Sequence, residues 1–124
     1  ELYEDFSLKE AIEFHTRFKT IAGNLNPKEI IAKLDLEKTK DKAIKHFSSG
    51  MKQRVRLGLA ILSETHVLLL DEPTSNLDRK WVKWYQDLIA EYCGGRLVVV
   101  CSNQQEYEYE FCTEQLNIED FKPQ

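Results

Sequence analysis

Two short, continuously apolar segments separated by a helical segment constrain the fold of this chain most. HVLLL (residues 66–70) and RLVVVCS (96–102) are too short for typical helices and do not alternate between polar and apolar residues. They therefore predict two strands that are buried on both faces. The segment between them, RKWVKWYQDLIAEYC (79–93), has apolar residues at three- and four-residue steps, which predicts a helix. The order strand, helix, strand predicts a right-handed β-α-β crossover with parallel strands.

Two strands alone cannot make a stable parallel sheet, because such sheets need cover on both faces and more neighbouring strands. We therefore expect the β-α-β unit to be the edge of a larger α/β domain whose remainder lies outside this chain. The chain also begins at Glu1 rather than Met, which suggests that a preceding segment has been removed.

The first half of the chain carries helix-start signals twice. SLKEAIEFHTRFKTIAG predicts a helix with Ser7 as N-cap, Glu10 completing a capping box and Gly23 as the stop. Its apolar stripe consists of Leu8, Ala11, Ile12, His15, Phe18 and Ala22. The second helix lies in NPKEIIAKL, where the cap, the first helical position and the capping-box partner are Asn26, Pro27 and Glu29.

The later helices have recognisable limits as well. MKQRVRLGLAILSE (51–64) is helical in pattern and follows FSSG, which supplies a serine cap and a glycine. Asp78 is the expected cap of the helix over 79–93, and the pair Gly94-Gly95 is its expected end. Trp81, Trp84 and Tyr85 follow the helical spacing, so we interpret them as packing residues rather than as a platform for base stacking.

Composition narrows the function classes. At 124 residues the chain has the length of one ordinary domain, and 42% hydrophobic with 31% charged residues is a globular composition. A net charge of -4 gives no support for nucleic-acid binding, and no apolar run reaches the length of a membrane span. The cysteines lack C-x-x-C spacing and the histidines lack ligand spacing, which favours a reduced cytosolic compartment and no structural metal. These residues are Cys93, Cys101, Cys112, His15, His46 and His66.

The strongest chemical signal is the pair of carboxylates that ends the first strand, in VLLLDEPTSNLD (67–78). Asp71 is expected at the carboxyl edge of the sheet, where open α/β sheets bind ligands. A single carboxylate there is suited to Mg²⁺, which keeps its waters and prefers one or two carboxylates plus substrate phosphates. Glu72 is then placed to orient, or accept a proton from, a water that attacks a phosphate.

These segments carry a resemblance to a known family. VLLLDEPTSNLD resembles the Walker B strand and D-loop of ATP-binding cassette (ABC) ATPases, and FSSGMKQRVRLGLAIL (47–62) resembles their signature, usually written LSGGQ, with its QR-containing helix. The two occur in family order and at family spacing. The resemblance implies an α/β fold that is part of a P-loop NTPase, with a helical subdomain and the Walker B and switch-loop β-α-β portion of a parallel sheet.

The resemblance assigns the signature to five residues. Ser48 and Gly50 match the signature serine and its second glycine, which in the family face the γ-phosphate of ATP held by the opposite protomer. Ser49 and Met51 stand at the positions of the first glycine and the glutamine, and Phe47 replaces the leucine. A serine hydroxyl and backbone N–H groups at a helix N-terminus are suited to holding an anion.

Four further residues complete the implied site. Asp71 matches the Mg²⁺-associated aspartate, Glu72 the catalytic glutamate and Asp78 the D-loop aspartate at the dimer seam. Asn103 stands where the family has a switch histidine. Asparagine can donate a hydrogen bond to phosphate but cannot carry a proton, so hydrolysis is expected to be slow or to depend more on Glu72. Asn103 fits a simple turn after a strand nearly as well.

The resemblance also divides the chain. Residues 1–45 match the helical subdomain, because LYEDFSLKEAIEF resembles the stretch after the Q-loop, and residues 46–124 match the signature helix, Walker B strand, D-loop helix, switch-loop strand and C-terminal segment. No glycine in the chain is followed by lysine, so the phosphate-binding loop G-x-x-x-x-G-K-S/T is absent from it. We therefore expect half of each composite site and little hydrolysis by the isolated chain.

The implied protein is the cytoplasmic ATPase subunit of an ABC transporter, peripheral to the membrane. Its cofactors are ATP and Mg²⁺, and its partners are a second ATPase subunit in a head-to-tail dimer and a membrane-spanning permease docked on the helical subdomain. One alternative is a nucleotide-dependent clamp or regulatory subunit that binds ATP without efficient hydrolysis. Another is a soluble relative acting on nucleic acid or cluster assembly, against which the lack of a coiled-coil insertion or basic tail counts.

Overall fold

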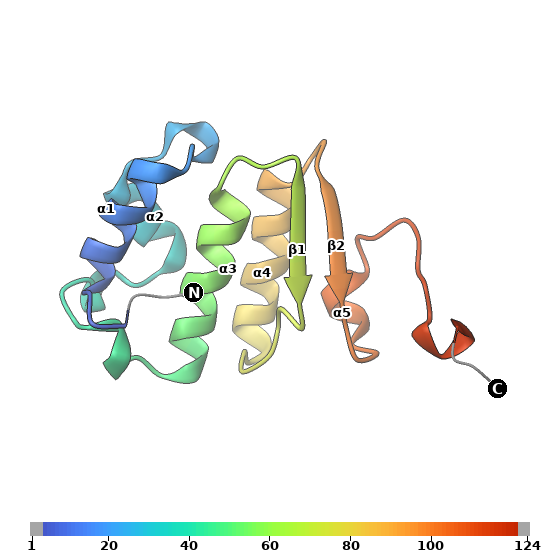
Figure 1. Ribbon diagram of the computed structural model, residues 1–124. Helices are drawn as coiled ribbons and strands as arrows, with labels where there is room; N and C mark the ends of the chain where they lie inside the picture. Colours follow the sequence, from blue (N-terminus) through green and yellow to red (C-terminus); the bar gives the residue numbers. More distant parts are fainter. Residues whose placement is uncertain (1–3, 122–124) are drawn as a thin grey trace.

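A computed structural model describes residues 4–121 as a helical part joined to a two-stranded parallel sheet with helices on one side (Figure 1). The expected limits at residues 1 and 124 lie outside the described residues. The helices are α1 (Leu8–Phe18), α2 (Pro27–Leu34), α3 (Ser49–Leu62), α4 (Arg79–Tyr92) and α5 (Glu106–Tyr109). The strands are β1 (Val67–Asp71) and β2 (Leu97–Cys101). Short 3₁₀ turns cover Ala22–Asn24, Glu37–Thr39, Ile44–His46 and Ile118–Phe121.

The capping signals of the first two helices are confirmed. The Ser7 hydroxyl accepts from the Glu10 amide at 3.2 Å, and the Glu10 carboxylate accepts from the Ser7 amide at 3.0 Å. The same reciprocal pair joins Asn26 and Glu29 at 2.8 and 3.1 Å, and Pro27 occupies the first helical position. Both helices therefore begin where two orphan amide groups are satisfied.

The predicted end of the first helix is wrong. Helix α1 ends at Phe18 rather than at Gly23, because Ile21 leaves the helix and forms an antiparallel bridge with Ser63 after α3. The Glu64 amide donates to the Thr20 carbonyl at 2.8 Å, and Ile21 is buried. Two members of the expected stripe are affected. Phe18 is 70% exposed, and Ala22 lies outside the helix.

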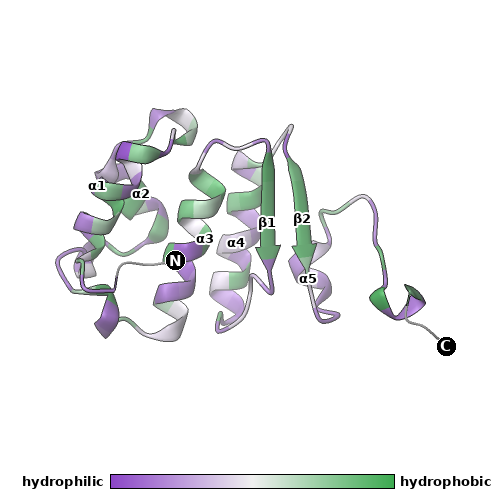
Figure 2. Ribbon diagram, in the orientation of Figure 1, coloured by the Kyte–Doolittle hydropathy of each residue, from purple (hydrophilic) through white to green (hydrophobic). Residues whose placement is uncertain are grey.

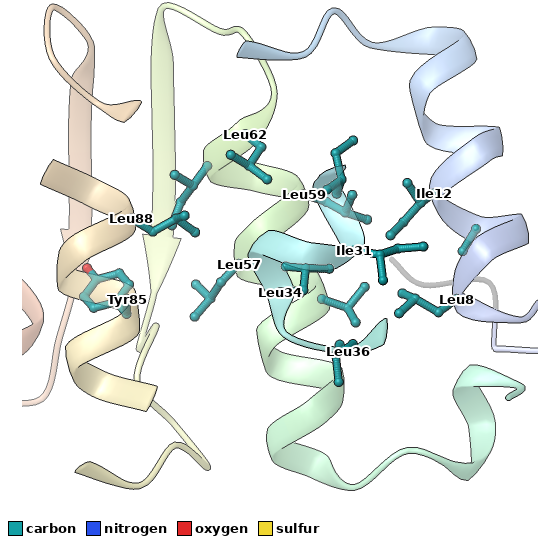
Figure 3. Packing of buried hydrophobic residues seen from close by; sticks show 14 of the residues in the cluster. Leu8, Ile12, Ile31, Leu34, Leu36, Leu57, Leu59, Leu62, Tyr85 and Leu88 are labelled. Atoms are coloured by element: carbon teal, nitrogen blue, oxygen red, sulfur yellow. The ribbon is translucent and has the colours of Figure 1, made fainter. Parts of the chain in front are cut away.

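One core of aliphatic side chains joins the helices to the sheet. Figure 3 shows side chains from α1, α2, α3 and α4 facing one another. Gly58 allows α2 to approach α3 closely, since a Cβ atom at Gly58 would lie 2.0 Å from Cδ2 of Leu34. The helical part and the signature helix therefore pack through direct contact.

The sheet is parallel as predicted, with Val67 opposite Leu97 and Asp71 opposite Cys101. The prediction of burial on both faces is wrong within the described residues. Strand β1 alternates, so that Leu68 and Leu70 are buried while Leu69 is 71% exposed. The large exposed apolar side chains of the two strands are Val67, Leu69, Leu97 and Val99. Helices α3 and α4 cover one face, and both strands are largely apolar, apart from Asp71 at the end of β1 (Figures 1 and 2).

No helix between residues 4 and 121 combines the length and apolar character needed to cross a membrane.

Candidate functional site

The expected site residues gather at one end of the molecule. Strands β1 and β2 end side by side at Asp71 and Cys101, and the N-terminal ends of α3 and α4 lie at the same end (Figure 1). This end combines the carboxyl edge of a parallel sheet with the positive ends of two helix dipoles. An anionic ligand and an associated cation both fit such an arrangement.

Asp71 and Glu72 are exposed at this edge. The Glu72 amide donates to the Cys101 carbonyl at 2.8 Å and so extends the pairing of the strands by one residue. Glu72 has φ of 43°, a left-handed conformation that costs a non-glycine residue of order 1–3 kcal/mol. The chain therefore turns sharply immediately after Asp71 and leaves both carboxylates accessible.

The donor set suits Mg²⁺ bound mainly by water and phosphate. Within residues 4–121 no group of three or more His, Cys, Asp or Glu side chains is arranged to hold a metal ion. A lone accessible carboxylate at a strand end, such as Asp71, fits a cation that keeps most of its waters.

The loop after β1 leads into α4 through two turns. The Ser75 amide donates to the Glu72 carbonyl and the Leu77 amide to the Thr74 carbonyl, both at 3.0 Å. Asn76 has φ of 63°. Asp78 then caps α4, because its carboxylate accepts from the Trp81 amide at 3.2 Å. The predicted capping role of Asp78 is confirmed.

The signature segment forms the start of α3. Ser48 is the N-cap, and its hydroxyl oxygen accepts from the Met51 amide at 3.1 Å, which leaves the hydroxyl proton available for a ligand. Ser49 and Gly50 are the first helical residues, whose amides have no intrahelical acceptor. Ser49 is exposed, whereas Met51 is half-buried against the core. Ser48, Ser49 and Gly50 thus present a hydroxyl group and backbone amides of the kind suited to an anion, and Met51 packs against the core.

The signature helix contacts the loop after β1 directly. A Cβ atom at Gly50 would lie 2.9 Å from the Asn76 carbonyl oxygen, so a side chain there would require one of the two backbones to move. The Gln53 side chain donates to the Pro73 carbonyl at 3.0 Å. Within residues 4–121 no hydrogen bond joins the signature segment to Asp71 or Glu72 themselves. The signature segment and the Asp71-Glu72 pair are therefore connected through the loop between β1 and α4.

Asn103 is exposed in the loop that follows β2. Gln104, the next residue, has φ of 61°, so this loop also contains a left-handed non-glycine residue. Since β1 and β2 pair in register to their ends, the loop that carries Asn103 begins beside the loop that carries Glu72. The Asn103 side chain is accessible to solvent.

Sequence reasoning missed Glu108, which is 1% exposed on α5. Its Oε2 accepts from the Thr74 amide at 2.8 Å and from the Thr74 hydroxyl at 2.6 Å, and its Oε1 bonds the Ser102 hydroxyl. Its backbone carbonyl accepts from the buried Tyr85 hydroxyl at 2.7 Å. No local signal marks this residue, because its partners come from three separate segments.

Arg54, from the QR pair after the signature, was also missed. It is 7% exposed, donates to the Leu34 carbonyl at 3.0 Å and lies 3.5 Å from the centre of the Trp81 ring. Burial lowers the pKa of Arg54, and the opposing attraction of Asp35 and Asp78 limits the effect. Arg54 therefore ties the end of α2 to the start of α4.

The interpretation of the α4 aromatics as packing residues is confirmed. Trp84 donates to the Lys33 carbonyl at 2.8 Å, and Tyr85 is fully buried. Burial is also the main cause that raises the pKa of the Tyr85 hydroxyl above its ordinary value. That hydroxyl therefore stays protonated as a donor to Glu108.

Cys101 ends β2 opposite Asp71, and His46 ends the 3₁₀ turn that precedes the signature segment. Cys93 is buried, and burial raises its pKa, which keeps the thiol protonated. His15 bonds the Ser63 hydroxyl at 2.8 Å at the opposite end of α3.

Several known proteins are similar to this chain. The family model described as ABC transporter matches residues 3–75. The chain is similar to the uncharacterized ABC transporter ATP-binding protein YybJ of Bacillus subtilis (strain 168), with 33% identity covering 78% of this chain and 45% of YybJ. It is also similar to the phospholipid-transporting ATPase ABCA3 of Rattus norvegicus, with 29% identity covering 82% of this chain and 6% of that protein. The chain thus spans less than half the length of these relatives.

Among solved structures, the chain resembles the RNase-L inhibitor with a TM-score of 0.62 and 21% identity. The match covers 78% of this chain and 19% of that one. At this identity the likeness concerns the fold alone. It fits the partial P-loop NTPase fold predicted from the sequence.

Proposed function

This chain belongs to the ABC transporter family, and from that membership we propose that it supplies the signature, Walker B and switch-loop part of an ATPase that powers transport through a membrane partner. One observation carries the proposal. The carboxylates of Asp71 and Glu72 lie at the end of a strand that pairs in register with the strand leading to Asn103, and the loop after them contacts the signature helix.

Each residue has a task in this function. Bound Mg²⁺ would neutralise charge on the phosphates, and Asp71 would hold it through its water shell. Glu72 orients the attacking water and accepts its proton. The Ser48 hydroxyl and the amides of Ser49 and Gly50 bind the γ-phosphate of ATP held by a second ATPase subunit. Asp78 lies at the seam of that head-to-tail dimer.

The chain by itself is not a competent ATPase in this proposal. It contains no G-x-x-x-x-G-K-S/T sequence, and phosphoryl transfer depends on positioning and electrostatic stabilisation by such a loop and its lysine. Activity thus belongs to the full-length protein, in which residues 46–124 form part of the ATPase core and residues 1–45 form the helical subdomain.

The permease is proposed to dock on the helical subdomain at the cytoplasmic face of the membrane. An open depression of about 430 Å³ is lined there by the end of α1 and the following turn, and Phe18 at its rim is 70% exposed. An exposed aromatic beside a concave surface is typical of a protein interaction site.

The test compares the full-length protein with its Glu72→Gln variant, and uses Glu64→Gln as a matched control at an exposed glutamate outside the site. We expect Mg²⁺-dependent hydrolysis by the wild type and the control, and an ATP-bound dimer without turnover for Glu72→Gln. Equal turnover by all three proteins would remove Glu72 from the chemistry and overturn the proposed role of this edge.

A nucleotide-dependent clamp is the second candidate, favoured by Asn103 at the switch position and by Ser49 in the signature. In that case the wild type binds ATP and dimerises without turnover. The Asn103→His variant tests this candidate further. Higher turnover by the variant would show that Asn103 limits hydrolysis in the wild type, as the clamp requires. Unchanged turnover would show that Asn103 is not the reason for slow hydrolysis and would weaken the clamp candidate.

A further inference from the structure

Glu108 occupies a position that the proposed roles do not explain. It lies on a helix of four residues, yet its side chain is 1% exposed and is surrounded by hydrogen-bond donors from two loops. Thr74 on the loop after β1 donates its amide and hydroxyl to Oε2, at 2.8 and 2.6 Å. Ser102 on the loop after β2 bonds Oε1.

The orientation of these donors makes the carboxylate the acceptor throughout. The Ser102 oxygen accepts from the Gln105 amide at 3.3 Å, so its own proton can point to Glu108. No ion pair in residues 4–121 involves Glu108, and neutral donors alone satisfy it. A buried carboxylate is costly unless it is hydrogen-bonded in this way, so the three bonds hold both loops to one side chain.

The two loops that Glu108 joins carry the proposed chemical groups. Glu72 lies two residues before Thr74, and Asn103 follows Ser102 directly. Both loops contain a left-handed non-glycine residue, with φ of 43° at Glu72 and 61° at Gln104. Such conformations persist only where the surrounding structure holds them.

We propose that Glu108 is a positioning residue that fixes the Glu72 loop and the Asn103 loop relative to each other. Its side chain bonds Thr74 and Ser102 rather than Glu72 or Asn103, so it acts on those two residues through their loops. Its backbone carbonyl, held by Tyr85 at 2.7 Å, anchors the carboxylate to α4. The kinetic part of this inference depends on the proposed ATPase function, whereas the structural part does not.

The test uses the full-length protein with Glu108→Ala and Glu108→Gln, and with Glu106→Ala as the control at an exposed carboxylate on the same helix. The glutamine amide can accept from Thr74 through its oxygen and donate to Ser102 through its nitrogen. The Ser102 hydroxyl can then turn to the Gln105 carbonyl, 3.5 Å away. Glutamine therefore preserves the connection without the charge.

For Glu108→Ala we expect kcat to fall by roughly tenfold or more with KM for ATP changed by less than about twofold, since a small misplacement of reacting groups acts mainly on the chemical step. Amide hydrogen exchange should accelerate in residues 72–78 and 102–106 together, and stay unchanged in α3. Glu108→Gln and Glu106→Ala should retain both the wild-type kcat and the wild-type exchange.

If Glu108→Ala does not fold, Thr74→Val and Ser102→Ala replace it, because each removes a single hydroxyl from the connection. Each should then lower kcat and accelerate exchange in its own loop. A folded Glu108→Ala, or this pair of variants, with wild-type kcat and exchange would overturn the inference. A Glu108→Gln variant as impaired as Glu108→Ala would overturn it too, because charge rather than positioning would then matter.

A wild-type protein without turnover would refute the proposed ATPase function separately. The exchange measurement would still decide the inference in that case, since unchanged exchange in both loops refutes it.

Discussion

The contact between Gly58 and Leu34 allows a quantitative prediction about how the helical part is attached to the signature helix. A Cβ atom at Gly58 would lie 2.0 Å from Cδ2 and 3.4 Å from Cγ of Leu34, and Leu34 is 0% exposed. Carbon atoms prefer separations of about 3.5–4.0 Å, so Gly58→Ala requires Leu34 to move by roughly 1.5–2 Å inside a filled core.

The magnitude follows from two opposing effects. Overpacking a core costs about 1–3 kcal/mol, whereas alanine is favoured over glycine in a helix by about 1 kcal/mol. On the native background we therefore expect Gly58→Ala to lower the free energy of unfolding by up to about 2 kcal/mol. On a Leu34→Ala background, which itself costs about 2–5 kcal/mol, the clashing atoms are gone and Gly58→Ala should stabilise by up to about 1 kcal/mol.

The assay is urea unfolding of the four proteins in this double-mutant cycle, followed through tryptophan fluorescence because Trp84 bonds the Lys33 carbonyl at the end of α2. Gly94→Ala is the matched control, since a Cβ atom there meets nothing within 4 Å. The same effect of Gly58→Ala on both backgrounds would refute the reasoning, because it would show that α2 does not press on α3 at this point.

Three other sites give predictions. Burial lowers the pKa of His15 below its ordinary value of 6.5, with the charge of Lys19 as a smaller cause, so unfolded chains bind its proton more readily. The contribution of neutral His15 to the free energy of unfolding should be fully present above pH 6.5 and be lost as the pH falls below that value. The urea midpoint of the His15→Gln variant should lack this pH dependence. Trp81→Leu should lower the free energy of unfolding by about 1–2 kcal/mol through loss of the stacked Arg54, and Trp81→Phe by less, as measured by urea unfolding. Phe18→Ser should change stability by less than about 0.5 kcal/mol yet weaken binding of the full-length protein, in a pull-down, to the permease proposed to dock on the helical subdomain.

The helix starts were predictable because their causes are local. Ser7 with Glu10, and Asn26 with Glu29, satisfy amides within four residues of chain, so the sequence contains the whole interaction. The end of α1 was not predictable from Gly23, because Ile21 is drawn out of the helix by pairing with Ser63, more than forty residues away. A tertiary contact therefore overrides a valid local stop signal.

The sheet illustrates a different limit. An unbroken apolar run such as LLL in β1 indicates a strand whose two faces can both be buried. It does not indicate whether the residues that cover each face belong to the described part of this chain. Leu68 and Leu70 find cover on α3 and α4, whereas Leu69 at 71% exposure does not. The sequence pattern correctly identified the strand and its parallel pairing, and overestimated the cover available within residues 4–121.

Part of the candidate site was predictable from the sequence and part of it was not. The place of Asp71 and Glu72 at the sheet edge was predictable because a polar residue that follows a buried strand lies there, whereas Asn103 was singled out only by the family resemblance. Glu108 was missed because EYEYE reads as a solvated acidic stretch. Its burial depends on donors at Thr74 and Ser102, which only the folded chain brings together.

The loop between β1 and α4 connects the segments that carry the candidate site residues. Its left-handed residue Glu72 has a conformation that persists only where the surrounding structure holds it. Gln53 holds it from α3, Glu108 holds it from α5, and the Glu72 amide holds it to β2. Gly50 lies against it without room for a methyl group, so the signature helix cannot move toward this loop without displacing it. A shift of the signature segment in that direction must therefore change the position of the residues that follow Glu72, and through Glu108 that of the loop that carries Asn103.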